Sequence, residues 1–238
     1  FLTELPEEIE MLVNLRHLNI SGTQLQEIPA QKSLQTLSGF VVSRQKNGLK
    51  VGELQKFPSL QGKLCISKLQ NIVDPCDASQ ANMKKKEQIE DLSLDLVLEH
   101  LQPSTNLNKL TIKFYGGTWF PNWLGNSSFA LPPVGQLHNL KELIIFDIIS
   151  VKTIGSLPVL KWLYFIECKN LKSFSISEEE EAPQCLTFLQ GFYILEWPKV
   201  AHIVTFHALL WIRRSSFECV GCSKLFVNHA CGVVENLL

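Results

Sequence analysis

The side chains with the most obvious chemistry lie near the carboxyl end, where Cys219 and Cys222 are separated by two residues and are followed by His229 and Cys231. A C-x-x-C pair brings two thiolates within reach of one tetrahedral zinc ion. The second half of this group is His-x-Cys, which is tighter than the spacing with which zinc sites normally continue. We therefore predict no metal here and interpret these cysteines as residues of a fading repeat.

The other candidate catalytic side chains stand alone. His17, His100 and His138 have no nucleophile or carboxylate at a motif spacing. The G-x-S-x-G and H-E-x-x-H patterns of hydrolases and metalloproteases do not occur in the sequence. The G-x-x-x-x-G-K-[ST] loop that cradles nucleotide phosphates is also missing from it. We predict that the chain is not an enzyme and that it holds no cofactor of its own.

The apolar residues that must position any functional side chain follow a repeating L-x-x-L-x-L pattern, first seen at Leu15, Leu18 and Ile20. This spacing fits neither a continuous helix nor a simple alternating strand. Successive copies are 18 to 33 residues apart, and their central residues are Leu18, Leu37, Leu64, Leu92, Leu110, Leu143, Leu163 and Phe192.

A pattern of this form with a period of roughly 20–29 residues is the signature of a leucine-rich repeat. One repeat cannot bury its own apolar face, so neighbouring repeats must stack on it. We predict an α/β fold, a leucine-rich-repeat solenoid (horseshoe) with a concave parallel sheet of short strands. About seven or eight irregular repeats should occupy residues 1–200, with a degenerate tail at 201–238 in which the repeat pattern fades.

One stretch favours a helix on the convex side of the repeats. Asp77 is a plausible N-cap for a helix over Ala78–Gln88. The three consecutive lysines Lys84–Lys86 are most simply a solvated face of that helix.

Composition excludes several classes of partner. The 238 residues are 45% hydrophobic and 19% charged, and the net charge is −1. This balance indicates a protein with a real core and no electrostatic footprint for nucleic acid or acidic lipid. No apolar run reaches the roughly 18–20 residues that span a bilayer, and no signal peptide is visible. Because the seven cysteines lack disulfide-framework spacing, we expect reduced thiols and a cytoplasmic location.

The residues between the buried strand leucines should face the concave surface, which is the usual binding face of a solenoid. The early repeats place polar groups there, and the last three place aromatic and branched apolar groups, which is typical of an interaction site. The predicted protein-binding residues are Asn19, Ser21, Ser67, Ser93, Asp95, Thr111, Lys113, Ile144, Phe146, Tyr164, Ile166 and Tyr193, with Cys65 and Leu195 at equivalent positions.

Several short motifs occur in a specific order. They begin with Leu5-Pro6-x-x-Ile9-x-x-Leu12-x-Asn14-Leu15, and continue with Val97-Leu98-Glu99-x-Leu101-Gln102-Pro103, Phe120-Pro121-x-Trp123 and Leu131-Pro132-Pro133-x-Gly135-Gln136-Leu137. Together they resemble the repeats of plant nucleotide-binding leucine-rich-repeat disease-resistance proteins of the coiled-coil class, over about Leu2–Leu171. Against that family the chain lacks an insertion before Val97 and a repeat between Trp123 and Leu131.

The resemblance implies a function. Such repeats act as the protein-interaction module of an intracellular immune receptor, in pathogen effector recognition and in autoinhibition. The implied partners are a pathogen effector or a guarded host protein, and the nucleotide-binding domain of the same receptor. ADP or ATP is implied only for that other domain. The alternatives are an ectodomain fragment of a cell-surface leucine-rich-repeat receptor, or a truncated non-functional remnant.

Overall fold

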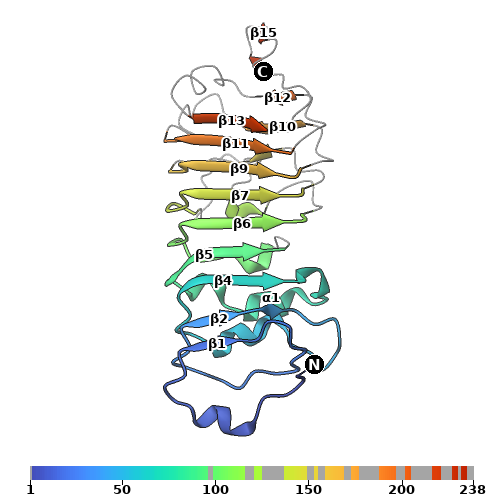
Figure 1. Ribbon diagram of the computed structural model, residues 1–238, viewed down its shortest axis with the longest axis vertical. Coiled ribbons are helices and arrows are strands. Elements are labelled where there is room, and N and C mark those ends of the chain that lie inside the picture. Colours follow the sequence, from blue (N-terminus) through green and yellow to red (C-terminus); the bar gives the residue numbers. More distant parts are fainter. Residues whose placement is uncertain are drawn as a thin grey trace. The chain divides into compact units, whose positions relative to one another are not determined.

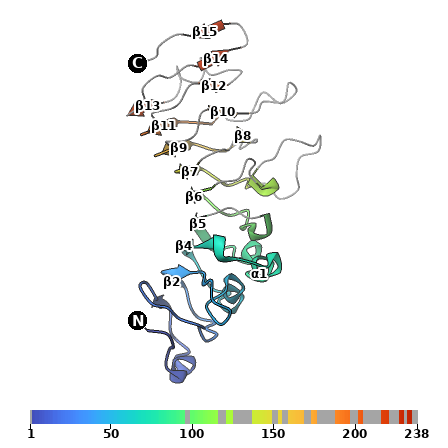
Figure 2. The same ribbon diagram turned by 90° about the vertical axis from the view of Figure 1, so that its right-hand side faces the viewer.

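Short, mostly parallel strands follow one another along the described part of the chain, and short helical turns lie between several of the strands up to β7, as in stacked leucine-rich repeats. The computed structural model describes residues 2–95, 99–115, 121–124, 137–148, 153–154, 159–168, 173–176, 188–196, 202–204, 216–220, 227–229 and 232–234. The chain forms two compact units, which we call unit 1 (Phe1–Leu107) and unit 2 (Asn108–Leu238). Figures 1 and 2 show the elements of each unit, which are described separately below.

Unit 1 contains two sets of parallel strands backed by short helices. Strand β1 pairs with β2, and β3, β4 and β5 pair in that order. The strands are β1 (His17–Asn19), β2 (Thr36–Ser38), β3 (Phe40–Val41), β4 (Gly62–Ser67) and β5 (Ile89–Leu94). The helices are α1 (Pro75–Gln80) and the 3₁₀ turns Glu7–Met11, Val51–Lys56, Leu69–Asn71, Met83–Lys85 and Glu99–Leu101. In Figure 2, α1 lies on one side of β4 and β5.

Unit 2 contains two sheets. In the first, β6, β7, β9, β11 and β13 pair in that order and all run parallel. The second joins β8, β10, β12 and β14 in parallel, with β15 antiparallel to β14. The strands are β6 (Lys109–Lys113), β7 (Glu142–Phe146), β8 (Thr153–Ile154), β9 (Trp162–Ile166), β10 (Ser173–Ile176), β11 (Gly191–Leu195), β12 (His202–Val204), β13 (Ser216–Val220), β14 (Val227–His229) and β15 (Gly232–Val234), with a 3₁₀ turn at Asn122–Leu124.

The strands pair in the register that the repeat pattern sets. In unit 2, Leu143 lies opposite both Leu110 and Leu163, and Leu163 lies opposite Phe192. These side chains are at least nine-tenths buried, and each such burial stabilises the fold by about 1.5–3 kcal/mol. Strands β6 and β7 pair directly although 33 residues separate their central leucines, so the connections absorb the uneven spacing. The predicted α/β leucine-rich-repeat fold is confirmed.

Strand β13 pairs with β11 over five residues, which places a parallel strand beyond residue 200. The division of the chain into a repeat region at 1–200 and a tail at 201–238 stays a prediction.

One irregularity in unit 1 requires a glycine. Gly39 separates strands β2 and β3. Its φ is +76°, a value that residues with an L side chain rarely adopt. A Cβ added there would lie 2.4 Å from the backbone of Ser21. The extra residue places Phe40 opposite Ile66 and buries the Phe40 ring completely. Gly39 therefore marks the point at which the chain leaves the pairing of β2 with β1 and enters the pairing of β3 with β4.

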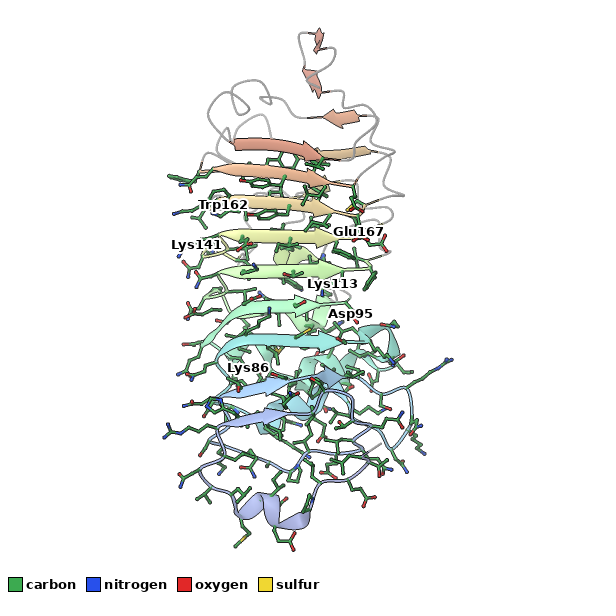
Figure 3. All side chains as sticks on the ribbon, in the orientation of Figure 1. Lys86, Asp95, Lys113, Lys141, Trp162 and Glu167 are labelled. Atoms are coloured by element: carbon green, nitrogen blue, oxygen red, sulfur yellow. The ribbon has the colours of Figure 1, made fainter. Side chains whose placement is uncertain are left out.

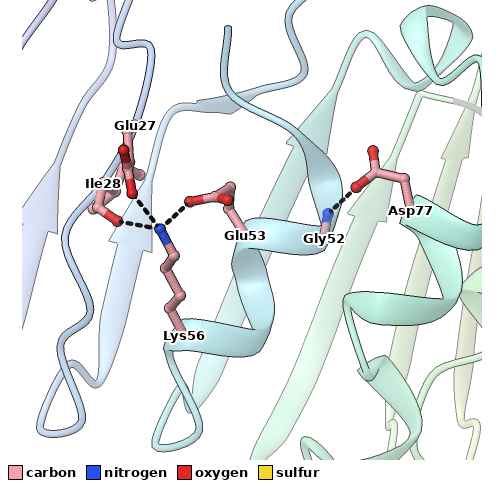
Figure 4. Close-up of polar contacts among 6 residues, drawn as sticks. All are labelled: Glu27, Ile28, Gly52, Glu53, Lys56 and Asp77. Atoms are coloured by element: carbon pink, nitrogen blue, oxygen red, sulfur yellow. Dashed lines mark hydrogen bonds and ion pairs between the residues drawn. The ribbon is translucent and has the colours of Figure 1, made fainter. Parts of the chain in front are cut away.

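The helix of unit 1 differs from the sequence prediction. Helix α1 begins three residues earlier, with Pro75 at its first turn and Asp74 as the N-cap, whose carboxylate accepts a 2.8 Å hydrogen bond from the Cys76 N–H. The prediction of an Asp77 cap was wrong because the ring of Pro75 fixes its φ near the helical value, which favours Pro75 in the first turn of the helix. Asp77 instead accepts a 2.9 Å hydrogen bond from the Gly52 N–H of the preceding repeat (Figure 4).

A second contact between repeats is centred on Lys56. Its ammonium lies 2.7 Å from a Glu27 carboxylate oxygen and 2.6 Å from one of Glu53, and it donates to the Ile28 carbonyl at 3.5 Å (Figure 4). Burial by itself lowers the pKa of Lys56, but the two carboxylates outweigh burial and raise it. These contacts of Lys56 attach the 3₁₀ turn Val51–Lys56 to the earlier segment that contains Glu27 and Ile28.

The lysine triplet was only partly predicted correctly. Lys84 and Lys85 are exposed, but Lys86 is 4% exposed and donates a 2.7 Å hydrogen bond to the Phe57 carbonyl. Burial lowers the pKa of Lys86 to about 8. The third lysine therefore satisfies a carbonyl at the end of a neighbouring helical turn, a role that a charge run does not reveal.

A left-handed residue follows the strand in repeat after repeat. It stands four positions after the central leucine or phenylalanine, at Gly22, Lys68, Phe114, Asp147, Glu167 and Glu196, with φ between +46° and +75°. In unit 2 the N–H of this residue extends the row of hydrogen bonds between parallel strands, as in the 2.7 Å bond that the Glu196 N–H donates to the Val220 carbonyl. In unit 1 the Lys68 N–H donates to the Asp95 carboxylate at 2.8 Å. Five of the six residues are not glycine, so these positions are strained.

We predict that Lys68→Gly unfolds at a higher urea concentration than Lys68→Ala, by about 1 kcal/mol in free energy of unfolding. Both variants remove the same exposed side chain, but only glycine adopts the observed φ of +59° without strain. Equilibrium unfolding followed by circular dichroism measures the difference. An alanine variant as stable as the glycine variant would contradict the left-handed backbone at this position.

We also predict that Lys86 makes a contribution to the free energy of unfolding that rises with pH between about 8 and 10.5. Its pKa is about 8 in the folded chain and about 10.4 in an unfolded one, so the unfolded state binds more protons in this window. The contribution between pH 7.5 and 10 is about 2 kcal/mol. Because Cys168, whose pKa burial raises to about 11, acts in the opposite direction, the measurement is a difference between chains: in urea titrations, the change in free energy of unfolding from pH 7.5 to 10 should be more positive, by about 2 kcal/mol, in the parent chain and in Lys85→Met than in Lys86→Met. Equal pH profiles for all three chains would show that Lys86 titrates normally.

Candidate protein-binding surface

The first sheet of unit 2 presents one face to its core and the other to its surroundings. Along β6, β7 and β9 the residues alternate between partly exposed and buried positions, as expected for a strand covered on one side. We call the partly exposed side the open face of unit 2. It consists of Lys109, Thr111, Lys113, Glu142, Ile144, Phe146, Trp162, Tyr164, Ile166, Tyr193 and Leu195.

Parallel pairing arranges the open face in three columns across the sheet. The first runs through Lys109, Glu142, Trp162 and Gly191, the second through Thr111, Ile144, Tyr164 and Tyr193, and the third through Lys113, Phe146, Ile166 and Leu195. The second and third columns hold the seven unit 2 residues that the sequence predicted for protein binding. The predicted residues of this unit are therefore brought together on one surface.

The first column was missed by the sequence analysis. Its members precede the first strand leucine by one residue, and the same period of two that identified the second column would have found them. Lys109 and Glu142 form an ion pair of 2.9 Å, with side chains 33% and 27% exposed. Trp162 stands next in this column and is labelled in Figure 3.

Three aromatic rings form the centre of the open face. The Tyr164 and Tyr193 rings stack with centroids 4.7 Å apart and an interplanar angle of 11°. Trp162 lies 6.2 Å from Tyr193 at an angle of 30°. Aromatic pairs of this kind contribute about 0.5–1.5 kcal/mol beyond the area that they bury. The rings therefore hold one another in place, which lowers the entropy cost of ordering them when a partner binds.

Gly191 makes room for this arrangement. A Cβ at this position would lie 2.6 Å from ring atoms of both Trp162 and Tyr193.

Burial raises the pKa of the Tyr164 hydroxyl, and Glu142 and Tyr193 raise it further, against an opposing effect of Lys109. The phenol is therefore protonated at neutral pH and able to donate a hydrogen bond.

The edge of the face at β6 carries a further aromatic contact. Phe114 and Phe146 meet edge to face with centroids 5.8 Å apart, and Phe114 is 53% exposed. Exposed aromatic groups next to aliphatic ones are the composition found at the centres of protein interfaces.

The predicted residues of unit 1 form a different, polar surface. Asn19 and Ser21 are exposed, and the Asn19 side chain accepts a 3.0 Å hydrogen bond from the Ser21 N–H. Cys65 and Ser67 are partly exposed on β4. Ser93 is only 6% exposed, and Asp95 is bonded to the Lys68 N–H. The Ser93 and Asp95 side chains therefore contribute to the fold of unit 1.

Among the residues that the structure describes, no group of three His, Cys, Asp or Glu side chains is placed to hold a metal ion. Cys65, Cys76 and Cys168 are free thiols there. Cys222 and Cys231 lie outside the described ranges, so the interpretation of the Cys219–Cys231 group stays a prediction. None of the helices in the described part is long and apolar enough to cross a bilayer.

Stacked strands with L-x-x-L-x-L cores and an open parallel sheet define a leucine-rich-repeat protein. A family model described as R13L1/DRL21 LRRs matches residues 51–171, just over half of the sequence. The chain belongs to this family of leucine-rich repeats.

Its curated relatives are named as disease resistance proteins. At3g14460 of Arabidopsis thaliana is 35% identical over 160 residues, which are 52% of this chain and 11% of that protein. RPP13-like protein 1 of the same plant is 34% identical over 46% of this chain and 14% of its own length. RGA1 of Solanum bulbocastanum is 31% identical over 62% of this chain and 18% of its own. The chain thus spans between about a tenth and a fifth of the length of these relatives.

We predict that Gly191→Ala loosens the aromatic centre. The added methyl group cannot fit beside the Trp162 and Tyr193 rings, and overpacking of this kind costs about 1–3 kcal/mol. Near-ultraviolet circular dichroism should weaken, and unfolding should shift to lower urea. As a control, the same substitution in a Trp162→Val background should cost less, because one of the two clashes is gone. Equal costs in both backgrounds would mean that the rings do not lie over Gly191.

Proposed function

We propose that this chain is a protein-interaction module of a plant intracellular immune receptor, which takes part in recognising a pathogen effector and in holding the receptor inactive. Membership of the R13L1/DRL21 repeats and the disease-resistance names of the relatives support the defence role. The observation that carries the binding role is the open face of unit 2, a continuous set of aromatic and branched apolar side chains on parallel strands.

The open face has the properties of an interaction surface. Tyr and Trp supply large contact areas with few rotatable bonds, and they dominate the binding energy of protein interfaces. The partners in this proposal are proteins, namely an effector or a guarded host protein and the receptor's own nucleotide-binding domain. A catalytic role and a nucleotide site in this chain form no part of it. The receptor acts in the cytoplasm, where the three described thiols stay reduced.

Autoinhibition and recognition use the same physical principle. A partner shifts an equilibrium between two receptor states only by binding one of them more tightly. If the nucleotide-binding domain contacts the open face in the inactive state, an effector that competes for this face favours the active state. The free energy of that competition sets the size of the response.

The family match favours this function over an ectodomain of a cell-surface receptor. Repeats of cell-surface receptors carry Asn where Thr23 stands here, and they end in Gly-x-Ile-Pro where this chain has Gln26-Glu27-Ile28-Pro29. A non-functional remnant remains the third candidate.

The transcript around the segment that encodes Phe1–Leu238 separates the three candidate functions. An in-frame phosphate loop followed by a nucleotide-binding domain supports the proposal, a signal peptide moves the chain to the cell surface, and a stop codon directly upstream leaves a remnant.

We predict that Tyr164→Ala combined with Phe146→Ala strongly weakens partner binding in the receptor assembled from that transcript. Truncating two aromatic anchors of the open face should weaken binding by about 30-fold or more. In transient leaf expression, the variant should cause cell death without an effector, because the inactive state has lost a contact.

The matched control is Met11→Ala with Val13→Ala, which removes exposed apolar groups from unit 1 and should leave the receptor silent. Thermal unfolding of the purified chain checks that both variants fold. A folded Tyr164→Ala/Phe146→Ala receptor that remains silent and still responds to its effector would show that this face binds neither partner.

A further inference from the structure

The open face of unit 2 is bordered by charges of opposite sign at its two edges. Lys141 and Lys161 directly precede β7 and β9, so they stand at the amino edge of the sheet, beside the Lys109–Glu142 ion pair. Asp147, Glu167 and Glu196 directly follow β7, β9 and β11, so they stand at its carboxyl edge. In Figure 3, Lys141 and Glu167 lie at opposite ends of the strands, with Trp162 at the same end as Lys141.

Parallel pairing is the cause of this segregation. The Asp147 N–H donates to the Ile166 carbonyl, the Glu167 N–H to the Leu195 carbonyl and the Glu196 N–H to the Val220 carbonyl. The three acidic residues therefore occupy the same left-handed position on successive strands. Adjacent strands are about 4.8 Å apart, so each edge presents its charges as a row. At β6 the equivalent position holds Phe114, next to Lys113, so the acidic row is limited to β7, β9 and β11.

The spacing of the strands matches that of a helix. One turn of an α-helix rises about 5.4 Å, close to the step of about 4.8 Å from one strand to the next. A helix lying across the strands would therefore bring one apolar side chain per turn to each repeat. From β6 to β11 there are three such steps, which corresponds to about three helical turns.

We propose that the occupant of the open face is an amphipathic helix of another protein, which lies across β6, β7, β9 and β11. Its apolar stripe covers the second and third columns, which include Ile144, Tyr164 and Ile166. Basic residues on one flank of the stripe face Asp147, Glu167 and Glu196, and acidic residues on the other flank face Lys141 and Lys161. This proposal rests on the proposed function, because it specifies the partner of the same surface.

Charge complementarity also sets the direction of the helix. Turning a helix end for end on the face exchanges its two flanks. With basic residues on one flank and acidic ones on the other, only one direction places both against opposite charges, and juxtaposed like charges disfavour the other. The apolar columns therefore supply the contact area, and the charged edges select the partner and its orientation.

The test uses two synthetic helical peptides and the chain Phe1–Leu238. Each peptide has about 18 residues, long enough to form a measurable helix, with leucines at i, i+3, i+4 and i+7. The segregated peptide carries Arg on one flank and Glu on the other. The mixed peptide has the same composition, with both residues alternating on both flanks. Fluorescence anisotropy measures binding, and circular dichroism measures helix formation.

We expect the segregated peptide to bind at least about fivefold more tightly than the mixed one at low salt. This preference should shrink in 0.5 M NaCl, a concentration chosen because salt screens exposed charges. Asp147→Lys with Glu196→Lys should remove the preference and instead favour a peptide with Glu on both flanks. Tyr164→Ala with Phe146→Ala should weaken both original peptides alike.

Several outcomes would overturn the proposal. Equal binding of the two peptides would mean that the charged edges select nothing, and binding without a gain in helicity would mean that the occupant is extended. Self-association of the chain that depends on Tyr164 would identify a second copy as the occupant. If neither peptide binds while the leaf assay gives the expected cell death, the helix proposal fails and the proposed function stands. If the peptides bind as expected and the leaf assay is silent, the proposed function fails.

Discussion

The backbone ladder between parallel strands is the constraint on which the rest of the structure depends. It places equivalent residues of successive repeats opposite one another, as it does for Leu143, Leu163 and Phe192. Because side chains alternate along a strand, a ladder that stacks leucine on leucine also stacks the intervening positions on one another. A surface with three ordered columns follows from burial of the core, without any further interaction to arrange it.

The same ladder places the charges at the ends of β7, β9 and β11 in one row. Each strand of the open face ends in a residue with positive φ whose N–H bonds to the next strand. Such a backbone turns the chain out of the sheet and leaves the side chain at the edge, where water solvates a carboxylate easily. The repeat thus accepts strain at Asp147 and Glu196 and gains a continuous hydrogen-bonded edge. Core, open face and charged border are consequences of one register.

The sequence predicted what depends on the register, and missed what depends on contacts between distant segments. The L-x-x-L-x-L pattern put Ile144, Phe146, Tyr164 and Tyr193 on one face, which is where the strand register also puts them, because a period of two is local information. Burial of Lys86 was not predictable, since it depends on the Phe57 carbonyl of another repeat. The sequence around Gly191 does not reveal the Trp162 ring beside it, because that ring comes from the preceding strand of the sheet. Such features require the stacked neighbour.

The register of β7 against β9 is the central claim, and paired cysteines test it most directly. In the chain carrying Ile144→Cys and Tyr164→Cys, the two positions are direct partners on the open face, about 4.8 Å apart across the strands. Mild oxidation should cross-link this pair. The pair Ile144→Cys and Trp162→Cys, offset by two residues along β9, should remain reduced, because its Cα separation exceeds the range of a disulfide. Cross-linking of the offset pair in place of the direct one would contradict the register and remove the basis of the binding surface.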